Sequence, residues 1–532
     1  MLRVADVNLP LDHPPQALRA AIVQRLGVAD AQLLDFSVYR RGYDARRRGH
    51  IALVYTVDVR LTDADERALL AASAAKIQHT PDQQYRFVAH APSTLRERPV
   101  VVGFGPCGLF AALILAQSGF RPIVLERGKA VRERTRDTWG LWRGRQLHPE
   151  SNVQFGEGGA GTFSDGKLWS QVSDPKHYGR KVLEEFVAAG APEEIRYVSK
   201  PHIGTFRLVS MIEKMRGQIE ALGGEIRFSQ RVDDILIEDG RVQGVRLAGG
   251  ATLACRHLVL ALGHSARDSF AMLARNGVFI EAKPFSIGFR IEHPQSLIDA
   301  DRFGPQAGHP LLGAADYKLV HHASNGRSVY SFCMCPGGTV VAATSEAGQV
   351  VTNGMSQYSR NERNANAGLV VGVGPADYPG DVLAGIAFQR HWERHAFVLG
   401  GGDYSAPGQR VSDFLAGRPS TAFGSVIPSY QPGVKPTDLS TALPDDCIAA
   451  LREALPALER KLKGFALADA VLTAVETRTS SPIRVRRDAD FQSVNTRGLY
   501  PAGEGAGYAG GIMSAAIDGI EVAQAVALAM NN

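Results

Sequence analysis

Residues 100–128 read VVVGFGPCGLFAALILAQSGFRPIVLERG, and this segment restricts the fold of the chain more than any other. An apolar run leads into Gly103, Gly105 and Gly108, an apolar helical segment follows, and a second apolar run ends at Glu126. Glycines permit a tight turn whose amides approach a pyrophosphate at a helix N-terminus, and the acid accepts hydrogen bonds from ribose hydroxyls. The spacing therefore predicts a Rossmann-type dinucleotide site rather than only a tight strand–helix turn.

A second glycine-rich segment, SNVQFGEGGAGTFSDGKLWS, occupies residues 151–170. Its many N–H groups, around Gly158 and Gly159, can wrap a phosphate or the edge of an isoalloxazine ring. Ser164 and Lys167 could meet a flavin or a phosphate from this loop. The alternative is a flexible loop, but loops so rich in small residues usually line a site.

The C-terminal segment 498–530, GLYPAGEGAGYAGGIMSAAIDGIEVAQAVALAM, predicts a strand, a glycine-rich turn and a long helix. Gly503 and Glu504 would reach the ribityl and pyrophosphate region of a flavin dinucleotide. Gly510, Gly511 and Ile512 would offer backbone N–H groups at a helix N-terminus, which stabilises an anionic reduced ring. A strand that returns this late completes the first domain only if another domain is inserted between the two parts.

The whole chain is expected to be α/β, with a Rossmann-type FAD-binding domain and an inserted antiparallel-sheet substrate domain. A ferredoxin-like α+β domain with the order βαββαβ precedes them. In that domain Gly27 ends the first helix, Thr62 caps the helix of DADERALLAASAAK, and QQYRFVAH, residues 83–90, is the closing strand. The expected boundaries are 1–92 for the N-terminal domain, 99–276 and 464–532 for the FAD-binding domain, and 277–463 for the inserted domain.

Composition limits the functional classes. Net charge is +5 over 532 residues, so a basic surface must be local. The N-terminal domain has such a cluster at Arg40, Arg41, Arg46, Arg47, Arg48 and His50. A solvated hairpin tip is the favoured interpretation, and the alternative is a docking patch for RNA, an acidic partner or an anionic part of a cofactor.

No signal peptide is expected at the N-terminus, and the apolar run GLFAALILAQSGF is too short to span a bilayer. Five cysteines, an odd number, do not form a disulfide framework, so we expect a reducing, cytoplasmic setting. The segment GVGPAD fails as a second dinucleotide motif because Asp377 replaces the third glycine and Pro379 prevents a helix. NAD(P)H, as an electron donor, would therefore bind transiently on another surface.

The stretch YSFCMCPGG contains Cys333 and Cys335, for which four interpretations stay open. A metal site would need further ligands, such as His391 and His395, and lacks the usual C-x-x-C spacing. A disulfide within C-x-C closes a small, strained ring and would be catalytic rather than structural. The other two interpretations are the lining of a substrate cavity and plain strand packing.

Several of these segments together resemble a known family. The chain is similar to the bacterial FAD-dependent dehydrogenases, also described as NAD(FAD)-utilising dehydrogenases, of the glutathione-reductase-like flavoprotein class. More distantly it is similar to geranylgeranyl reductases and electron-transfer-flavoprotein quinone oxidoreductases. The resemblance rests on GFGPCG with Glu126, NVQFGEGGAGTFSDGKL, KPFSIGFRIEHPQ, FCMCPGGTVVAATSE, NGMSQYSRN, TRTSSPIR and PAGEGAGYAGGI, and it spans most of the chain.

The resemblance implies FAD as the cofactor and leaves the substrate unassigned. We expect an oxidoreductase that transfers hydride at flavin N5, with an RNA-modifying or RNA-binding flavoprotein as the alternative. The catalytic candidates are Cys333 and Cys335, and no metal site is predicted. The cofactor-binding candidates are Gly103, Gly105, Pro106, Cys107, Gly108, Glu126, Arg127, Gly158, Gly159, Thr162, Ser164, Lys167, Val232, Gly263, Gly503, Glu504, Gly510, Gly511 and Ile512.

Overall fold

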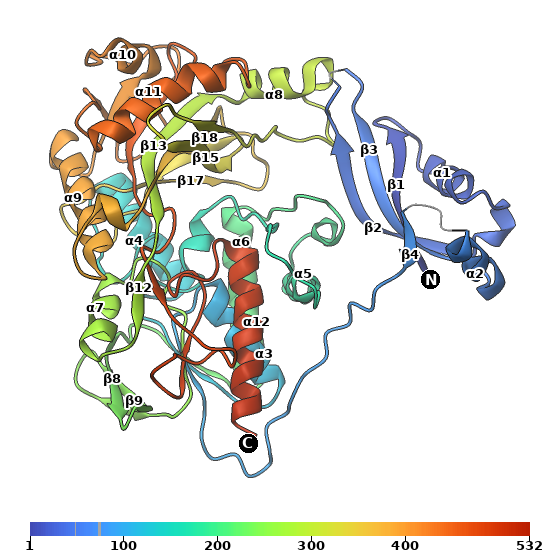
Figure 1. Ribbon diagram of the computed structural model, residues 1–532, viewed down its shortest axis with the longest axis horizontal. Helices are drawn as coiled ribbons and strands as arrows, with labels where there is room; N and C mark the ends of the chain where they lie inside the picture. The colour runs from blue at the N-terminus through green and yellow to red at the C-terminus, as the bar shows by residue number, and fades with distance from the viewer. Residues whose placement is uncertain (48, 73–75, 532) are drawn as a thin grey trace.

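The N-terminal region is a four-stranded antiparallel sheet with two helices packed against it (Figure 1). The computed structural model describes residues 1–47, 49–72 and 76–531. The elements are β1 (Leu2–Pro10), α1 (Ala17–Leu26), β2 (Asp35–Asp44), β3 (Ala52–Arg60), α2 (Asp63–Ala71) and β4 (Ile77–His79). Their order is the predicted βαββαβ, and the sheet order is β2-β3-β1-β4. Gly27 ends α1 in the left-handed region, and the Thr62 hydroxyl accepts a hydrogen bond from the Asp65 N–H, as predicted.

The predicted closing strand at 83–90 is wrong. The last strand of this sheet is β4, which pairs with β1 through Val4 and Ile77, and residues 73–75 of the predicted second helix lie outside the described residues. Residues 83–90 are extended but unpaired with any strand. Their alternating pattern reflects packing against α5 (Tyr178–Ala188) instead, because the Tyr85 ring lies 5.8 Å from the Tyr178 ring between centroids.

The β2–β3 hairpin contacts two distant segments of the chain. The Arg41 N–H donates to the Tyr197 carbonyl at 2.6 Å, and the Arg41 carbonyl accepts from the Ser199 N–H at 2.9 Å. The Tyr43 ring packs edge-on against Phe303. The predicted solvated tip is thus engaged on one side, while the exposed members of the basic cluster are Arg40, Arg46, Arg47 and His50. Arg48 lies outside the described residues.

A five-stranded parallel sheet combines strands from both ends of the main body. It consists of β5 (Val100–Val102), β6 (Ile123–Leu125), β7 (Glu225–Arg227), β11 (Leu258–Leu260) and β23 (Leu499–Pro501), in the order β23-β11-β5-β6-β7. Every adjacent pair is parallel. Parallel strands are buried on both faces, and the side chains of β5 show this directly. Val101 belongs to one hydrophobic cluster, whereas Val100 and Val102 belong to another.

Three helices cover the Val101 face of the parallel sheet: α3 (Pro106–Gln117), α6 (Thr205–Ala221) and α12 (Ile512–Ala529) (Figure 1). The opposite face packs against β8 (Val232–Glu238), β9 (Arg241–Leu247) and α7 (Arg267–Arg275). Within the described residues, α12 alone is both long and apolar enough to cross a membrane, and 78% of that window is buried inside the fold. Its apolarity is therefore explained by packing in the core.

A seven-stranded mixed sheet forms most of region 284–476. Its order is β14 (Val320–His322), β15 (Ser328–Cys335), β18 (Asn364–Val373), β13 (Phe285–Pro294), β21 (Val471–Glu476), β19 (Ala406–Arg410) and β20 (Val434–Pro436). One face of β13, with Phe289 and Ile291, packs in the core beneath α11 (Asp445–Glu459). The alternate residues Ser286 and Arg290 lie on the opposite face.

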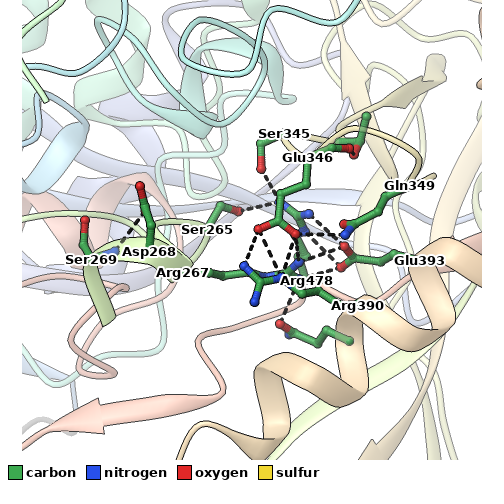
Figure 2. A network of polar contacts seen from close by, with 12 residues as sticks. Ser265, Arg267, Asp268, Ser269, Ser345, Glu346, Gln349, Arg390, Glu393 and Arg478 are labelled. Atoms are coloured by element: carbon green, nitrogen blue, oxygen red, sulfur yellow. Dashed lines mark hydrogen bonds and ion pairs between the residues drawn. The ribbon is translucent and has the colours of Figure 1, made fainter. Parts of the chain in front are cut away.

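A buried ionic network joins the two large sheets (Figure 2). Arg267 at the start of α7 and Arg478, just after β21, both pair with Glu393 on α9 (Ala384–Leu399). All three side chains are at most 3% exposed. Burial alone would raise the pKa of Glu393, but the Arg267 and Arg478 guanidinium groups lower it well below its usual range. The Arg478 guanidinium also donates to Ser265 and to Ser345, so four chain segments meet at one point.

Candidate functional site

The first glycine-rich turn is formed by close backbone approach. Gly103 has a φ of 97°, and a Cβ there would collide with the Ala261 carbonyl on the neighbouring strand segment. A Cβ at Gly108 would collide with the Gly103 carbonyl. α3 then begins at Pro106, which suits the first helical position because proline lacks an N–H. The N-terminal amides of α3 therefore open onto the turn, as the sequence predicted.

Glu126 lies at the end of β6 and is 5% exposed. Its carboxylate accepts three backbone hydrogen bonds, from Phe104 at 2.8 Å, Gly128 at 2.8 Å and Gly156 at 2.9 Å. The predicted ribose acceptor thus also ties the first glycine-rich turn to the second. Since a carboxylate has about four acceptor positions, one remains for a ribose hydroxyl.

The second glycine-rich loop packs directly on the first. The Gly158 N–H donates to the Phe104 carbonyl at 2.8 Å, and a Cβ at Gly159 would lie 2.8 Å from the Gly105 Cα. A Cβ at Gly161 would lie 3.0 Å from a side-chain carbon of Ile512. The two predicted loops and the start of α12 are therefore brought together.

Arg134 holds the second loop and was missed by the sequence analysis. Its side chain is fully buried in α4 (Val131–Gly144) and donates to the carbonyls of Asn152, Val153 and Glu157 at 2.7 Å each. Burial lowers its pKa to about 10. The available signal was its spacing, because Arg134 shares the buried face of α4 with Val131.

The C-terminal turn brings Gly503 and Glu504 to the same region. The Gly503 N–H donates to the Asp518 carboxylate at 2.6 Å, and a Cβ at Gly503 would lie 2.9 Å from Cys107 Cβ. Cys107 is therefore a packing residue between α3 and α12. Burial raises the pKa of Glu504 to about 7, with Lys283 opposing the shift and Cys333 adding to it.

The space around these residues fits FAD. Gly263 and Gly511 have φ values of 71° and 89°, and a Cβ at either would meet nothing within 4 Å. Gly510 and Gly511 are exposed at the N-terminus of α12. These positions leave backbone amides uncovered by side chains, as the approach of a pyrophosphate and a flavin ring requires.

The remaining predicted cofactor residues are held by local contacts within the protein or are buried. Arg127 is held by ion pairs with Glu150 and Asp268 and stacks on Phe155, so it buttresses the end of β6. Val232 begins β8 and is buried. Thr162 is buried beside Arg134, and the Ser164 hydroxyl donates to the Gly161 carbonyl at 2.7 Å.

Cys333 and Cys335 lie at a bulge of β15. The pairing of β15 with β18 shifts between Phe332 and Cys335, and Cys333 has a φ of 41°, which is uncommon for a residue with a side chain. The Cys335 thiol donates to the Cys333 carbonyl at 3.4 Å. The bulge thus places Cys333 and Cys335 in direct contact.

Side chains from the second glycine-rich loop and from the seven-stranded sheet surround this bulge. Lys167, from the second glycine-rich loop, donates to the Met334 carbonyl. The Arg290 guanidinium donates to the Cys333 carbonyl at 2.8 Å and pairs with Glu476 at 2.6 Å. Burial raises the pKa of Glu476 to about 7, while Arg290 opposes the shift. Arg290 and Glu476 were not predicted, because nothing in a single sequence shows that β13 and β21 are neighbours.

The two thiols have opposite titration behaviour. A hydrogen bond from Cys335, together with the nearby Lys167 and Arg290 cations, lowers the pKa of Cys333 to about 5 against the opposing effect of burial. The Cys333 thiolate and burial raise the pKa of Cys335 well above its usual range. These opposite shifts favour ionisation of the partly exposed Cys333 over that of the buried Cys335.

The metal interpretation of the cysteine pair finds no support. Among residues 1–47, 49–72 and 76–531, no group of three or more His, Cys, Asp or Glu side chains is arranged to hold a metal ion. His391 and His395 lie on α9 with Trp392 between them, and both rings contact that indole. The segment at 372–377 likewise follows β18, which is antiparallel to its neighbours, so it is not a Rossmann turn.

Comparison with known proteins supports a flavin protein. Residues 284–479 match the family described as "FAD-dependent protein, C-terminal domain-like", and residues 1–60 match a domain of unknown function. A protein of Clostridium beijerinckii, described as "Uncharacterized protein", is 46% identical over 526 residues, with 98% of each chain covered.

Solved structures show weaker similarity. The flavin-dependent brominase Bmp2 aligns with a TM-score of 0.36 and 12% identity, covering 82% of this chain and 80% of that one. The 3-ketosteroid-Δ4-(5α)-dehydrogenase of Rhodococcus jostii RHA1 aligns with a TM-score of 0.35 and 14% identity, covering 82% and 99%. CtdE in complex with FAD aligns with a TM-score of 0.30 and 11% identity, covering 82% and 89%. Similarity at this level assigns no substrate.

Proposed function

This chain belongs to the same family as the clostridial relative and carries the FAD-dependent C-terminal domain, and from these premises we propose that it is an FAD-dependent oxidoreductase. FAD is its cofactor. We infer that residues 99–276 and 464–532 form one FAD-binding unit, that 277–463 is an inserted substrate domain, and that 1–92 is a separate ferredoxin-like domain. Five free cysteines among the described residues support a reducing, cytoplasmic setting.

When bound, FAD supplies hydride and electron transfer at its N5 position. The two glycine-rich loops and Glu126 would hold the dinucleotide half, and Glu504 with the α12 N-terminus would face the flavin half. The α12 amides would favour negative charge on the ring next to them. The resident side chains do not need to form covalent bonds for this chemistry.

One observation carries the proposal: the two glycine-rich loops and the cysteine bulge lie against each other. Lys167 belongs to a glycine-rich loop yet donates to the Met334 carbonyl, between the two cysteines. Glu504, at the C-terminal turn, lies within electrostatic range of Cys333. A substrate bound on the sheet beside Cys333 would therefore also lie beside the flavin-binding residues.

We propose Cys333 and Cys335 as the catalytic pair of this face. A substrate that loses hydride to the flavin also loses a proton, and the Cys333 thiolate is placed to accept that proton. The Cys335 thiol, which donates to the Cys333 carbonyl, would hold the backbone of the bulge, and Lys167 and Arg290 would stabilise the thiolate charge. The competing hypothesis is that the pair cycles between dithiol and disulfide.

FAD addition followed by an anaerobic dithionite titration of the purified holoprotein tests both the cofactor assignment and the redox role of the cysteine pair. Appearance of the flavin absorption band on adding FAD supports the cofactor assignment, and a protein that stays colourless refutes it. About two electrons per FAD are expected if the flavin alone is reduced, and about four if the cysteine pair is redox-active as well. Cys333→Ser should lower the requirement only in the second case, with Cys447→Ser as the matched buried control. Repeating the reduction with NADH or NADPH tests the proposed transient donor.

A further inference from the structure

A cavity of about 440 Å³ opens beside Ser286 and Tyr330, and two of its lining residues, Phe285 and Val373, also belong to the hydrophobic core. It is lined by Pro284, Phe285, Ser286, Tyr330, Phe332, Gly372, Val373, Gly374, Thr479 and Ser480. These residues come from β13, β15, β18 and the segment after β21, so the cavity crosses the sheet rather than following one loop. A volume of this size suits a small organic ligand.

The chemistry of the walls is neutral. None of the ten lining residues is acidic or basic, and three of them are aromatic. A pair of hydroxyls supplies polarity, because Ser286 Oγ and Tyr330 Oη are hydrogen-bonded at 2.6 Å. The nearby Lys283 ammonium lies at the Ser480 end, within electrostatic range of Glu504, so a charged group beside the Ser286–Tyr330 pair would be desolvated without a counter-charge among the lining residues. Ring-containing groups, in contrast, gain favourable contacts with Phe332 and Tyr330.

Residues that line the cavity are sequence neighbours of the proposed site residues. Phe332 immediately precedes Cys333 at the bulge. At the other end, Lys283 precedes Pro284 and lies 3.4 Å from the Ser480 hydroxyl. Lys283 also lies within electrostatic range of Glu504. The two ends of the cavity thus adjoin the thiol pair and the C-terminal turn.

We propose that this cavity binds a neutral, ring-containing molecule that carries a hydroxyl or carbonyl group. The rings lie against Phe332, on the same face as Tyr330, and the oxygen exchanges hydrogen bonds with the Ser286–Tyr330 pair. That this ligand is the substrate rests on the proposed function, whereas its binding does not. Anionic groups such as phosphate esters and carboxylates are disfavoured beside the Ser286–Tyr330 pair, because Lys283 lies at the Ser480 end of the cavity and is within electrostatic range of Glu504.

Gly372 offers a way to fill the cavity without disturbing the sheet. It lies on β18 opposite Ser286, and a Cβ there would meet nothing within 4 Å. Its φ is not in the left-handed region, and valine is favoured in strands. Gly372→Val should therefore fold normally while occupying part of the ligand space. Gly217 on α6 also has open space around its Cβ, so Gly217→Val is the matched control.

The experiment is equilibrium dialysis of the FAD-loaded protein with three probes: 2-naphthol, naphthalene and 2-naphthoate. We expect 2-naphthol to bind, and 2-naphthoate to bind at least tenfold more weakly because its charge is unpaired in the cavity. Gly372→Val should weaken 2-naphthol binding at least tenfold, while Gly217→Val leaves it unchanged. Tyr330→Phe should weaken 2-naphthol binding but not naphthalene binding.

The possible outcomes test the cavity proposal and the FAD-dependent function separately. Equal binding of 2-naphthol and 2-naphthoate, or insensitivity to Gly372→Val, overturns the cavity proposal. The flavin spectrum of every variant is recorded in the same samples. A protein that binds FAD but no 2-naphthol contradicts this inference and leaves the proposed function standing. A protein that binds 2-naphthol but no FAD supports the cavity proposal and contradicts the proposed function.

Discussion

Cys333 differs from the other described cysteines in both exposure and charge. It is partly exposed with a pKa of about 5, whereas Cys107, Cys255 and Cys447 are buried. Burial raises the pKa of all three of those thiols. Since the thiolate is the nucleophile, reactivity should be confined to one site.

We therefore expect iodoacetamide at pH 6 to modify Cys333 at least tenfold faster than any other cysteine. The rate should be nearly independent of pH from 6 to 8, because Cys333 is already ionised there. Lys167→Met should raise the pKa of Cys333 and slow its modification at pH 6. Peptide mass spectrometry over a time course measures the site and the rate. Uniform labelling of Cys333 and Cys447 would contradict the charge assignment.

The raised pKa of Glu504 leads us to expect that FAD binding depends on pH. Its pKa is about 7 because of burial, so the side chain is largely protonated below that pH. The carboxylate would accept hydrogen bonds from the ribityl hydroxyls, so FAD affinity should fall as the pH drops below 7. The limit for one proton is about tenfold per pH unit. The raised pKa also favours the folded apoprotein at acid pH, and this contribution is lost as the pH rises through 7.

Flavin fluorescence titrations between pH 5.5 and 8.5 measure this effect. Glu504→Gln cannot titrate, so its dissociation constant should be nearly constant over the range. Glu504→Asp keeps the charge and should keep the slope. A wild-type dissociation constant that is independent of pH would show that Glu504 does not face FAD.

The residues of the dinucleotide cradle could be predicted because the signal is local. Gly103 and Gly108 are close in sequence, and each is required by a backbone contact, with the Ala261 carbonyl and within the turn respectively; a Cβ at Gly105 would make only an ordinary contact with Gly159. Arg290 and Glu476 could not be predicted in the same way. Their pairing depends on the adjacency of two strands far apart in the chain, which the pattern of one sequence does not contain.

At the level of elements, we expect the buried ionic network around Glu393 to contribute strongly to the free energy of unfolding. In Glu393→Gln, Arg478 would lose its buried counter-ion, and Arg267 would keep only the partly exposed Glu346, at 3.0 Å, of its two ion-pair partners. An uncompensated buried charge destabilises a fold by about 3–5 kcal/mol. Urea unfolding should show this loss. As a control, Glu213→Gln removes the partner of Arg132 in an ion pair whose arginine is 70% exposed, and should cost no more than about 1 kcal/mol. Equal losses in the two variants would show that the network is not a stabilising junction.

The elements themselves were predicted unevenly. Helices with capping residues, such as α1 ending at Gly27, followed from local sequence. The extended segment 83–90 was misassigned because alternation of apolar and polar residues arises equally from a strand and from an extended chain packed on a helix. The bulge at Cys333 was not predicted either, since a bulge depends on the partner strand.

At the scale of the whole molecule, the N-terminal sheet is docked by its β2 edge and by its hairpin. Arg41 exchanges backbone hydrogen bonds with Tyr197 and Ser199, and the Ile51 N–H donates to the Gln306 side chain at 3.0 Å. The sheet therefore contacts the region before α6 and the region after α8 (Gln295–Phe303). Composition indicated a basic hairpin but contained no information on what this hairpin contacts within the chain.

This arrangement bears on the RNA hypothesis for the basic cluster. Arg41 is engaged with Tyr197, and Arg46 forms an ion pair with Asp44 at 2.5 Å. Nucleic-acid binding at physiological salt depends on several simultaneous phosphate contacts, and these two arginines already have partners within the chain, so we expect no tRNA shift in a gel. The informative comparison is wild type with Arg46→Gln/Arg47→Gln and with Arg132→Gln/Arg136→Gln on α4, which removes the same charge elsewhere. A salt-sensitive shift lost only in the first double variant would establish the hairpin as an RNA site and overturn this expectation.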